Sequence, residues 1–568
     1  METIKNSKIW YVYGSLLVIA LILRFQQLQI PFLSEREAAV ALQAIEKSQA
    51  VPGAAGINGW LQILFFIFGE NEVSARIIPA IFGFLMIVTP LFFSKLIGKE
   101  TAILLSILIM FDPGQIAFSR QVDGAIITLF GLMFALGCVF EKKSIPAGIA
   151  IGLAFLGSPV FWPALISIFL ALRFTYFNRR YDDSSARASL VWDGLEFRHG
   201  LLALVLTVLL AGSGMGFHMA GAAAPFIHLM DYLKGWTTGG GISPILLLFS
   251  FLLYQPVVFI IGLVEGIRSI RERDLFNAFL IRLFGFSLLL AILYPSRDMD
   301  GMLVSYLPLL FLAARFVSRL IPSLGKPDLT AYGQMLLVIL LVPFIWMNLI
   351  ILEFPVEGQD STLRLAAVVG GFVLLIIASL LIRLGWSPIQ ASTGLWMGTA
   401  VLLFVFMFST AWRASGIGSF PEAELWNYYG VTDEVDLLRD TAGDLSEWNI
   451  MSRSGINIVI LNNTSSALRW ALRDFSSVNN DTSLPNLSNP AIVITENEEV
   501  PTLAQAYRGQ DFVITKRTAW SMILPEEWIQ WYAFRSLPVE RLEKILWART
   551  DLFPGASSTA PETITPIQ

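Results

Sequence analysis

Cysteine and charge are both scarce in this 568-residue sequence. The single cysteine, Cys138, lies inside an apolar segment, which excludes an internal disulfide and a cysteine-rich metal cluster. Charged residues make up only 15% of the chain, against 55% hydrophobic residues. This composition excludes an ordinary soluble protein, in which about 25% of residues are charged. Because no sustained basic run is present, the sequence also argues against nucleic acid as a partner.

Apolar runs long enough to cross a bilayer recur along the first 412 residues. Lys5 and Lys8 precede the first run, and no small-residue cleavage site follows it, so we predict an uncleaved first span. The run from 145 to 175 is interrupted by Gly157-Ser158-Pro159 and by Pro163, which predicts two spans that meet at a tight turn. The sequence thus predicts a polytopic α-helical membrane domain over 1–412 with about thirteen transmembrane helices. They fall near 8–25, 73–94, 100–118, 124–140, 145–175 (two), 200–217, 243–266, 277–294, 301–321, 333–352, 364–384 and 391–412.

The distribution of lysine and arginine predicts the orientation of these spans. A cytoplasmic N-terminus also places the basic short loops in the cytoplasm, including those with Lys95 and Lys99, Lys142 and Lys143, and Arg268, Arg271 and Arg273. The opposite loops are poor in both residues. An odd number of spans then puts the C-terminal region outside the cytoplasm, on the same side as a long first outer loop over about 26–72. We therefore expect a multi-pass protein of the plasma membrane.

The chain after about residue 413 differs in kind from the membrane domain. Short β-branched or apolar runs at Ile456 to Leu461, Ala491 to Thr495 and Phe512 to Thr515 predict strands, and Ser465 to Phe475 predicts a helix. We expect a small extracytoplasmic α/β domain over 413–552. The last stretch, 553–568, is rich in Pro, Ser and Thr and is predicted to be disordered.

Three ionisable residues, Glu35, Arg36 and Glu37, crowd together in the first outer loop. Charge beside a bilayer is costly unless it reaches water or has a function. At a helix N-terminus both glutamates could point at one site. The helix dipole also favours acidic side chains there, so an acidic first turn capped by Ser34 explains the same residues without any chemistry. Both interpretations stay open on these residues alone.

Two further outer loops carry ionisable groups. Asp123 lies in the very short loop Ser119 to Gly124, where it either faces a protein cavity or caps the following helix. The loop Tyr294 to Asp300 holds Arg297 beside two aspartates, a pattern that is typical of a solvated loop. Neither pattern identifies a site by itself.

Three motifs in sequence order resemble a known superfamily. They are Glu35-Arg36-Glu37-Ala38, then Phe68-Gly69 followed by Ala75-Arg76-Ile77-Ile78-Pro79, then Ser119-Arg120-Gln121-Val122-Asp123. The chain resembles the GT-C glycosyltransferases, in the branch of the protein O-mannosyltransferases and aminoarabinose transferases. The resemblance covers about 10–320 well and is weak in the C-terminal region. Two features depart from the family: its adjacent Asp-Glu pair is here Glu-Arg-Glu, and the Lys-Pro-Pro stretch of its first loop is absent.

The resemblance implies a membrane glycosyltransferase that moves a sugar from a polyprenyl-phosphate donor to a protein, lipid or envelope-glycan acceptor on the extracytoplasmic side. It implies Glu37 or Glu35 as the catalytic base, with Asp123 orienting the acceptor. The one cofactor it allows is a divalent cation, Mg²⁺ or Mn²⁺, held by Glu35 and Asp123. Cations stabilise a phosphate leaving group, and Arg297 and Arg76 are the candidates for this role.

Two alternatives to a transferase remain at this point. One is an inactive scaffold of the same fold. The other is a transporter or flippase of a lipid-linked substrate, which is expected to carry charges in the middle of its spans and paired broken helices. The sequence predicts only one break, at 157–163, and places its charges at the ends of outer loops.

Overall fold

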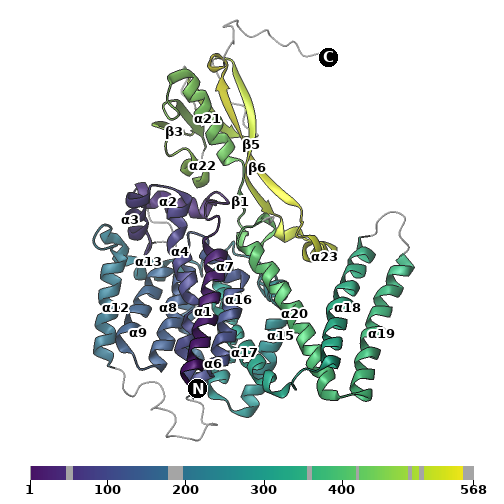
Figure 1. The fold of residues 1–568 in the computed structure, drawn as a ribbon. Helices are drawn as coiled ribbons and strands as arrows, with labels where there is room; N and C mark the ends of the chain where they lie inside the picture. Colours follow the sequence, from purple (N-terminus) through teal and green to yellow (C-terminus); the bar gives the residue numbers. More distant parts are fainter. Residues whose placement is uncertain are drawn as a thin grey trace.

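In the computed structural model, a helical bundle carries a mixed α/β domain at one end (Figure 1). The structure describes residues 2–46, 55–176, 196–354, 361–417, 421–462, 464–483, 489–497 and 505–553. The predicted disordered tail lies outside these residues from 554 onward. Helix α1 (Glu2–Phe25) begins at the end of the bundle that is opposite the α/β domain (Figure 1). The N-terminus and the C-terminal domain therefore lie at opposite ends of the bundle; which end faces the cytoplasm stays a prediction.

The helices make this a multi-pass membrane protein. Within the described residues, six helices are long and apolar enough to cross a membrane, and two bent pairs raise the number to eight. Six further apolar helices have only 10–17 residues, shorter than the about 20 needed for a full span. They are Tyr11–Phe25 of α1, α3 (Asn58–Phe68), α8 (Ala125–Phe140), α9 (Ser144–Gly157), Phe161–Thr175 of α10 (Phe161–Tyr176) and α12 (Phe197–Gly212). The count of about thirteen spans thus stays a prediction, whereas the turn between α9 and α10 is found where it was expected.

Two spans that were expected to be continuous are broken. Helices α6 (Lys99–Met110) and α7 (Pro113–Ser119) meet at 60°, and α14 (Pro244–Tyr254) and α15 (Pro256–Glu272) meet at 98°. Each second helix begins with a proline, whose missing N–H is tolerated in a first turn. At the breaks, Gln255 Nε2 donates to the buried Asp112 Oδ2 at 2.5 Å. The prediction of a single break at 157–163 was therefore wrong, because hydropathy stays high across both bends.

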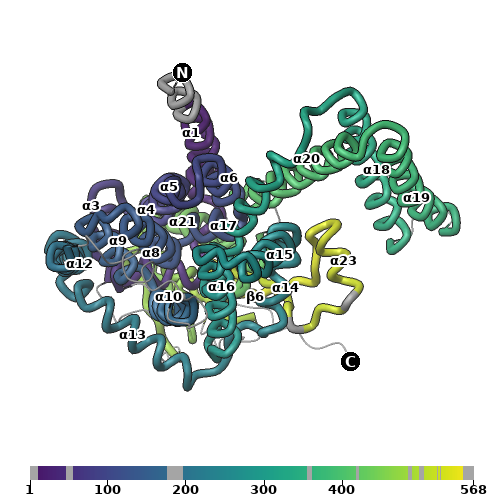
Figure 2. Tube along the Cα trace, turned by 90° about the horizontal axis from the view of Figure 1, so that it is seen from below, coloured from purple at the N-terminus to yellow at the C-terminus, as the bar shows by residue number. Residues whose placement is uncertain are grey.

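The remaining long helices frame the bundle and extend from it. Helices α16 (Leu275–Leu293) and α17 (Met302–Leu320) lie in the main bundle beside α10 and α15. Helices α18 (Leu329–Glu353) and α19 (Ser361–Gly385) form a hairpin that stands away from the bundle and joins it through α20 (Pro388–Ala414) (Figures 1 and 2). Only 17% and 11% of the most apolar windows of α18 and α19 are buried, so this hairpin presents its apolar side chains to lipid.

The first outer loop folds as two short helices between the bundle and the C-terminal domain. Helix α2 (Glu35–Glu46) and α3 lie directly beneath the α/β domain (Figure 1), and α4 (Glu72–Met86) follows them. Helix α2 is amphipathic and buries Ala38, Val40, Ala41, Leu42 and Ala44. Burial of this face fixes the direction of the ionisable residues in its first turn.

The C-terminal domain is built on a six-stranded sheet of order β1-β5-β6-β4-β2-β3. Strand β2 pairs in parallel with β3 and β4, and the other pairs are antiparallel. The three predicted strands correspond to β2, to β4 and to part of β5, and the predicted helix to the shorter α22. The elements are β1 (Val431–Thr432), α21 (Val435–Ile450), β2 (Asn457–Leu461), α22 (Ser466–Ala471), β3 (Ser477–Asp481), β4 (Ile492–Glu496), β5 (Tyr507–Thr518), α23 (Pro525–Phe534) and β6 (Val539–Arg549).

Aromatic side chains join this domain to the bundle. Trp470 of α22 is fully buried, and its Nε1 donates to Glu72 at 2.9 Å. On α23, Trp528 stacks on Phe249, and Tyr532 stacks on Phe406 with ring centroids 6.1 Å apart. Large aromatic rings with a polar tip are suited to such a contact between membrane and water. The sheet is thus held over the end of the bundle that is opposite the N-terminus.

Candidate active site

The first turn of α2 sends three neighbouring side chains in three directions. Successive residues of an α-helix point about 100° apart, so Glu35, Arg36 and Glu37 cannot share one face. Glu35 contacts α22 of the C-terminal domain, Arg36 faces a group of aspartates, and Glu37 is buried against Arg76 of α4. The acidic pair singled out in the sequence therefore does not form one site.

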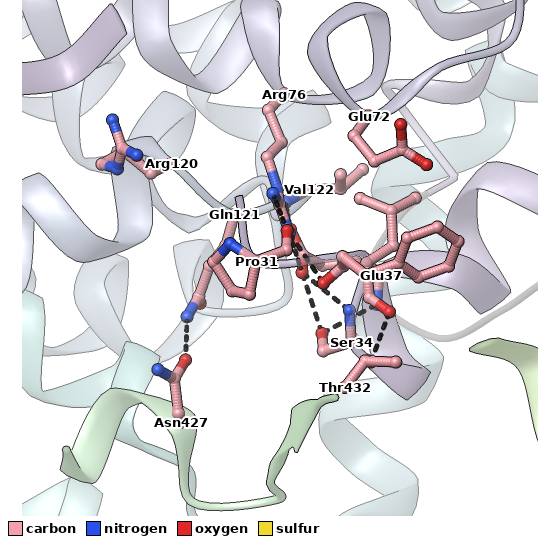
Figure 3. A network of polar contacts seen from close by, with 12 residues as sticks. Pro31, Ser34, Glu37, Glu72, Arg76, Arg120, Gln121, Val122, Asn427 and Thr432 are labelled. Atoms are coloured by element: carbon pink, nitrogen blue, oxygen red, sulfur yellow. Dashed lines mark hydrogen bonds and ion pairs between the residues drawn. The ribbon is translucent and has the colours of Figure 1, made fainter. Parts of the chain in front are cut away.

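Glu37 is held by its own helix start and by α4. Its Oε2 accepts from the N–H and the hydroxyl of Ser34, both at 3.0 Å, which is the Ser-x-x-Glu capping box. Arg76 donates from Nε and Nη2 to the two carboxylate oxygens, each at 2.8 Å, and the Val122 N–H adds a bond of 2.9 Å. Figure 3 shows these donors converging on Glu37. The carboxylate of Glu37 thus accepts five hydrogen bonds within the protein.

The guanidinium group of Arg76 is also fully engaged in hydrogen bonds within the protein. Its Nη1 donates to the carbonyl oxygens of Leu28 and Pro31 at 2.9 and 2.6 Å. Burial alone would raise the pKa of Glu37, but the Arg76 charge and the hydrogen bonds outweigh it and hold this pKa below its ordinary 4.5. The two residues line only a small cavity of about 50 Å³. Glu37 as the base and Arg76 as a phosphate ligand stay predictions, and the geometry gives both residues a structural role.

Glu35 binds the start of a helix in the C-terminal domain. Its carboxylate accepts from the Ser465 hydroxyl at 2.5 Å and from the N–H groups of Ser466 and Ala467 at 2.7 and 3.1 Å. These N–H groups are the unpaired donors of the first turn of α22, where a negative charge is favoured. Glu35 therefore connects the membrane domain to the sheet domain.

Arg36 lies at the centre of three aspartates from two loops. Its guanidinium is 2.5 Å from Asp298, 3.4 Å from Asp123 and 3.7 Å from Asp300, measured to the nearest carboxylate oxygen. Burial would lower the pKa of Arg36, but the three carboxylates raise it above its ordinary value, so the group stays charged. One cation faces three carboxylates here, whereas Glu37 and Arg76 balance each other. The structure thus brings together Asp123 and the 294–300 loop, two regions that the sequence left separate.

The aspartates differ in how firmly they are held. Asp123 Oδ1 accepts from the Ala125 N–H at 2.8 Å and so also caps α8, as one of the two interpretations of this residue expects. Asp298 Oδ1 accepts from the Met299 N–H at 2.6 Å. Asp300 makes the longest of the three contacts with Arg36, yet its side chain is only 10% exposed. Asp300 is therefore the carboxylate with the most capacity left to accept a proton.

A cavity of about 430 Å³ opens beside this cluster. Arg36, Asp298 and Asp300 form part of its wall, together with Lys234 and Arg297. Its other wall is apolar and is formed by side chains of the α9–α10 turn and of α10, α16 and α17: Val160, Pro163, Ala164, Leu290, Ala291 and Val304. The cavity thus has a charged end at the outer loops and an apolar end among membrane helices.

Contacts between two loops, one with Gly235 and Gly241 and one with Tyr294 and Arg297, hold the charged end of this cavity together. Ile242 N–H donates to the Arg297 carbonyl at 3.0 Å, and Arg297 Nη1 donates to the Tyr294 carbonyl at 2.9 Å. The loops approach so closely that a Cβ on Gly241 would lie 2.4 Å from the Arg297 nitrogen, and one on Gly235 would lie 1.8 Å from the Tyr294 hydroxyl. A side chain at Gly241 would clash with backbone atoms, so only glycine fits there, whereas a side chain at Gly235 would require the Tyr294 ring to move. The glycines after α13 (Ala224–Lys234) therefore position Lys234 and Arg297 on one wall.

Lys234 and Asp300 are functional candidates that the sequence did not single out for a role. Lys234 is a lone lysine at a helix end, and Asp300 lies in a loop whose sequence is typical of a solvated loop. Neither residue belongs to a recognisable sequence motif. The predicted cation ligands Glu35 and Asp123 point to different neighbours. Within the described ranges, no group of three or more His, Cys, Asp or Glu side chains is placed to hold a metal ion.

Comparison with known proteins gives a match in structure and none in sequence. No protein-family model and no curated protein matches the chain. A solved structure of ArnT from Cupriavidus metallidurans bound to undecaprenyl phosphate superposes with a TM-score of 0.55 at 12% identity, covering 95% of this chain and 98% of that one. The chain has the GT-C fold. ArnT in the apo state matches as well, with a TM-score of 0.54 over 96% of this chain and 99% of ArnT. The GT-C resemblance expected from the motifs is thereby confirmed at the level of the fold.

Proposed function

We propose that the protein is a membrane glycosyltransferase that takes a sugar from a polyprenyl-phosphate donor. The observation that carries this proposal is the cavity with an apolar end and a charged end, where Lys234 and Arg297 lie on the same wall as Asp298 and Asp300. A polyprenyl-phosphate sugar has the same three parts: an apolar chain, an anionic phosphate and a sugar. The similarity to ArnT, solved with undecaprenyl phosphate, supports the same class of donor.

The donor phosphate is assigned to the wall that Lys234 and Arg297 form. The side chain of Lys234 is exposed and has no ion-pair or hydrogen-bond partner among the residues the structure describes. Thr238 and Ser296, whose hydroxyl oxygens are 2.9 Å apart, lie on the same wall, and the Ser296 hydroxyl donates to the Thr238 carbonyl, so these residues join the two loops. The polyprenyl chain then lies along Leu290, Ala291 and their apolar neighbours. Lys234 thus takes the place of the lysine in the Lys-Pro-Pro stretch, which is absent from this sequence.

Asp300 is assigned as the general base. An acceptor hydroxyl gives its proton to Asp300 while its oxygen attacks the anomeric carbon, and the bond from that carbon to the phosphate oxygen breaks. The negative charge that develops on the leaving phosphate is stabilised by Lys234 and Arg297. Arg36 offsets one of the three carboxylate charges, so uptake of a proton by Asp300 reduces the excess negative charge of the cluster. We place this reaction on the extracytoplasmic side of the plasma membrane.

A transporter or flippase is the second candidate, because the two bent span pairs are the feature expected of one. The breaks meet at Asp112 and Gln255, where the cavity measures only about 20 Å³. This volume holds about one water molecule and no lipid-linked sugar. The geometry therefore favours transfer at the outer end of the bundle over passage through it.

Binding of undecaprenyl phosphate to the purified full-length protein in nanodiscs tests the proposal. We expect saturable binding that Lys234→Gln weakens about tenfold, since a charge-assisted hydrogen bond contributes about 1.5–3 kcal/mol. Lys326→Gln is the matched control, because Lys326 is exposed and follows α17 at the opposite end of this helix from the cavity.

Three outcomes are informative. Binding that depends on Lys234 and not on Lys326 supports the donor site. Absence of binding in the unsubstituted protein contradicts the proposed function. Movement of labelled lipid across the bilayer, without release of free polyprenyl phosphate from a sugar-bearing donor, favours the flippase.

A further inference from the structure

A second cavity lies on the other side of Arg36. It has a volume of about 680 Å³ and is enclosed by the start of α2, the start of α22 and strands β4, β5 and β6. Arg36 lines both this cavity and the 430 Å³ cavity that we assign to the donor. The aspartate cluster around Arg36 thus lies where a donor from the membrane side and a ligand from the α/β domain side meet.

The lining of this second cavity differs from that of the first. Apart from Ile514 and Leu542, its wall consists of charged, amide and hydroxyl side chains. The charges balance, with Glu35, Glu496 and Glu543 against Arg36, Arg541 and Lys544. A wall with many hydrogen-bonding groups and no net charge suits a ligand that is rich in hydroxyl groups and uncharged. Ile514 and Leu542 are its only apolar side chains, too few to hold an acyl chain, and Lys544 already pairs with Glu496, so the wall offers no excess of cations for a phosphorylated headgroup.

The sheet leaves little room for an extended peptide. Strand β4 pairs with β2 and β6, β5 pairs with β1 and β6, and β6 lies between β4 and β5. A peptide that binds by strand addition needs an unpaired edge. The strands that border the cavity are central ones, so a ligand meets their side chains and not their backbone.

We propose that this cavity is the acceptor site and that its ligand is an uncharged glycan. The inference rests on the proposed transferase function and adds the acceptor class to it. The acceptor enters beneath the α/β domain, and one of its hydroxyls reaches the carboxylates around Arg36. Glu35 holds the domain in place by capping α22, so that the cavity keeps its shape.

Saturation-transfer NMR on the full-length protein in nanodiscs tests this assignment without knowledge of the donor sugar. The probes are uncharged manno-, gluco- and galacto-tetrasaccharides, the same sugars with one phosphate, and a Ser/Thr-rich peptide. We expect at least one uncharged tetrasaccharide to bind, and Leu542→Trp, which fills the cavity, to weaken its binding at least tenfold. Leu437→Trp is the matched control, because Leu437 is 54% exposed, close to the 52% of Leu542, and does not line the cavity.

A second variant keeps the test valid if Leu542→Trp fails to fold. Arg541→Ala removes an exposed cavity side chain without adding bulk, and we expect it to weaken the same probe several-fold. Undecaprenyl phosphate is titrated on the same samples, and its affinity should not change in either variant. Binding that survives Leu542→Trp, stronger binding of the phosphorylated sugars or the peptide, or no binding of any uncharged probe overturns the glycan assignment. Loss of undecaprenyl phosphate binding from the unsubstituted protein overturns the proposed function instead, so the two failures are distinguishable.

Discussion

Arg76 and Arg36 both pair with carboxylates at the end of the bundle that carries the α/β domain, yet their surroundings are opposite. The Arg76 side chain is 3% exposed and contacts one glutamate and several carbonyl groups, so its one positive charge faces the one negative charge of Glu37. The Arg36 side chain is 41% exposed, faces three aspartates and borders two cavities. A matched, enclosed pair holds a fold together, whereas an excess of carboxylates beside a cavity is available for chemistry.

The largest expected effect is on transfer by the Arg36 cluster. Asp300→Asn removes the proposed base, so the rate of sugar transfer from a polyprenyl-phosphate donor should fall by about 10²–10⁴-fold. The unfolding temperature should change little, because the contact of Asp300 with Arg36 is long and an asparagine oxygen can still accept from the Gly301 N–H. Asp328→Asn, at an exposed site that follows the opposite end of α17, is the control. Full activity of Asp300→Asn would show that Asp300 is not the general base.

The second effect concerns stability and the Arg76 pair. Glu37→Gln leaves the Arg76 charge buried without its partner, which typically costs about 3–5 kcal/mol. The free energy of unfolding in detergent should fall accordingly. Glu46→Gln on the same helix breaks only the exposed pair with Arg469 and should cost less than about 1 kcal/mol. If Glu37→Gln keeps full stability and loses transfer, Glu37 is catalytic and the Arg76 pair is not merely structural.

A smaller, local effect is expected at the domain contact. Glu35→Gln weakens the cap on α22, and loss of such a cap costs about 1 kcal/mol. Hydrogen exchange of the Ser466 and Ala467 amides should become faster, while the strands of the sheet keep their protection. Glu46→Gln serves again as the control, since Glu46 also contacts α22 but not its first amides. Unchanged exchange at these two amides would show that Glu35 does not hold the domain.

The smallest effect is a pH dependence of stability that belongs to Glu37. Its pKa is lowered on folding, so its contribution to stability is present above its ordinary pKa of 4.5 and is lost as the pH falls below this value. The unfolding temperature of the unsubstituted protein should drop over this acid range, and the drop should be shallower in Glu37→Gln. Parallel pH profiles of the two proteins would contradict this assignment.

The overall architecture could be predicted from the sequence because its signals are local. Hydropathy located the long apolar segments, short β-branched and apolar runs located β2 and β4, and Gly157 to Pro163 marked the α9–α10 turn. The bends at Asp112 and Gln255 were missed because the mean hydropathy of each segment stays high, although Asp112-Pro113-Gly114 and Gln255-Pro256 are turn signals. The shortness of α8, α9 and α10 relative to a full span is likewise invisible to a hydropathy pattern.

The site was harder to predict because it depends on directions and on distant contacts. Sequence spacing brought Glu35 and Glu37 together, whereas the helix separates them and turns Arg36 toward Asp298, which is 262 positions away along the chain. Lys234 carries no motif, and only the close approach of Gly241 to the 294–300 loop shows that it shares a wall with Arg297. Motifs thus indicated the correct fold, and three-dimensional contacts were needed to divide its charged residues between structure and chemistry.

The most direct test of the central claim is a cryo-electron microscopy map of the full-length protein with undecaprenyl phosphate. We expect phosphate density beside Lys234 and Arg297, with the lipid chain along Leu290 and Ala291 and with the Glu37 and Arg76 pair intact. Phosphate density on Arg76, with Glu37 released from it, would show instead that Arg76 binds the donor.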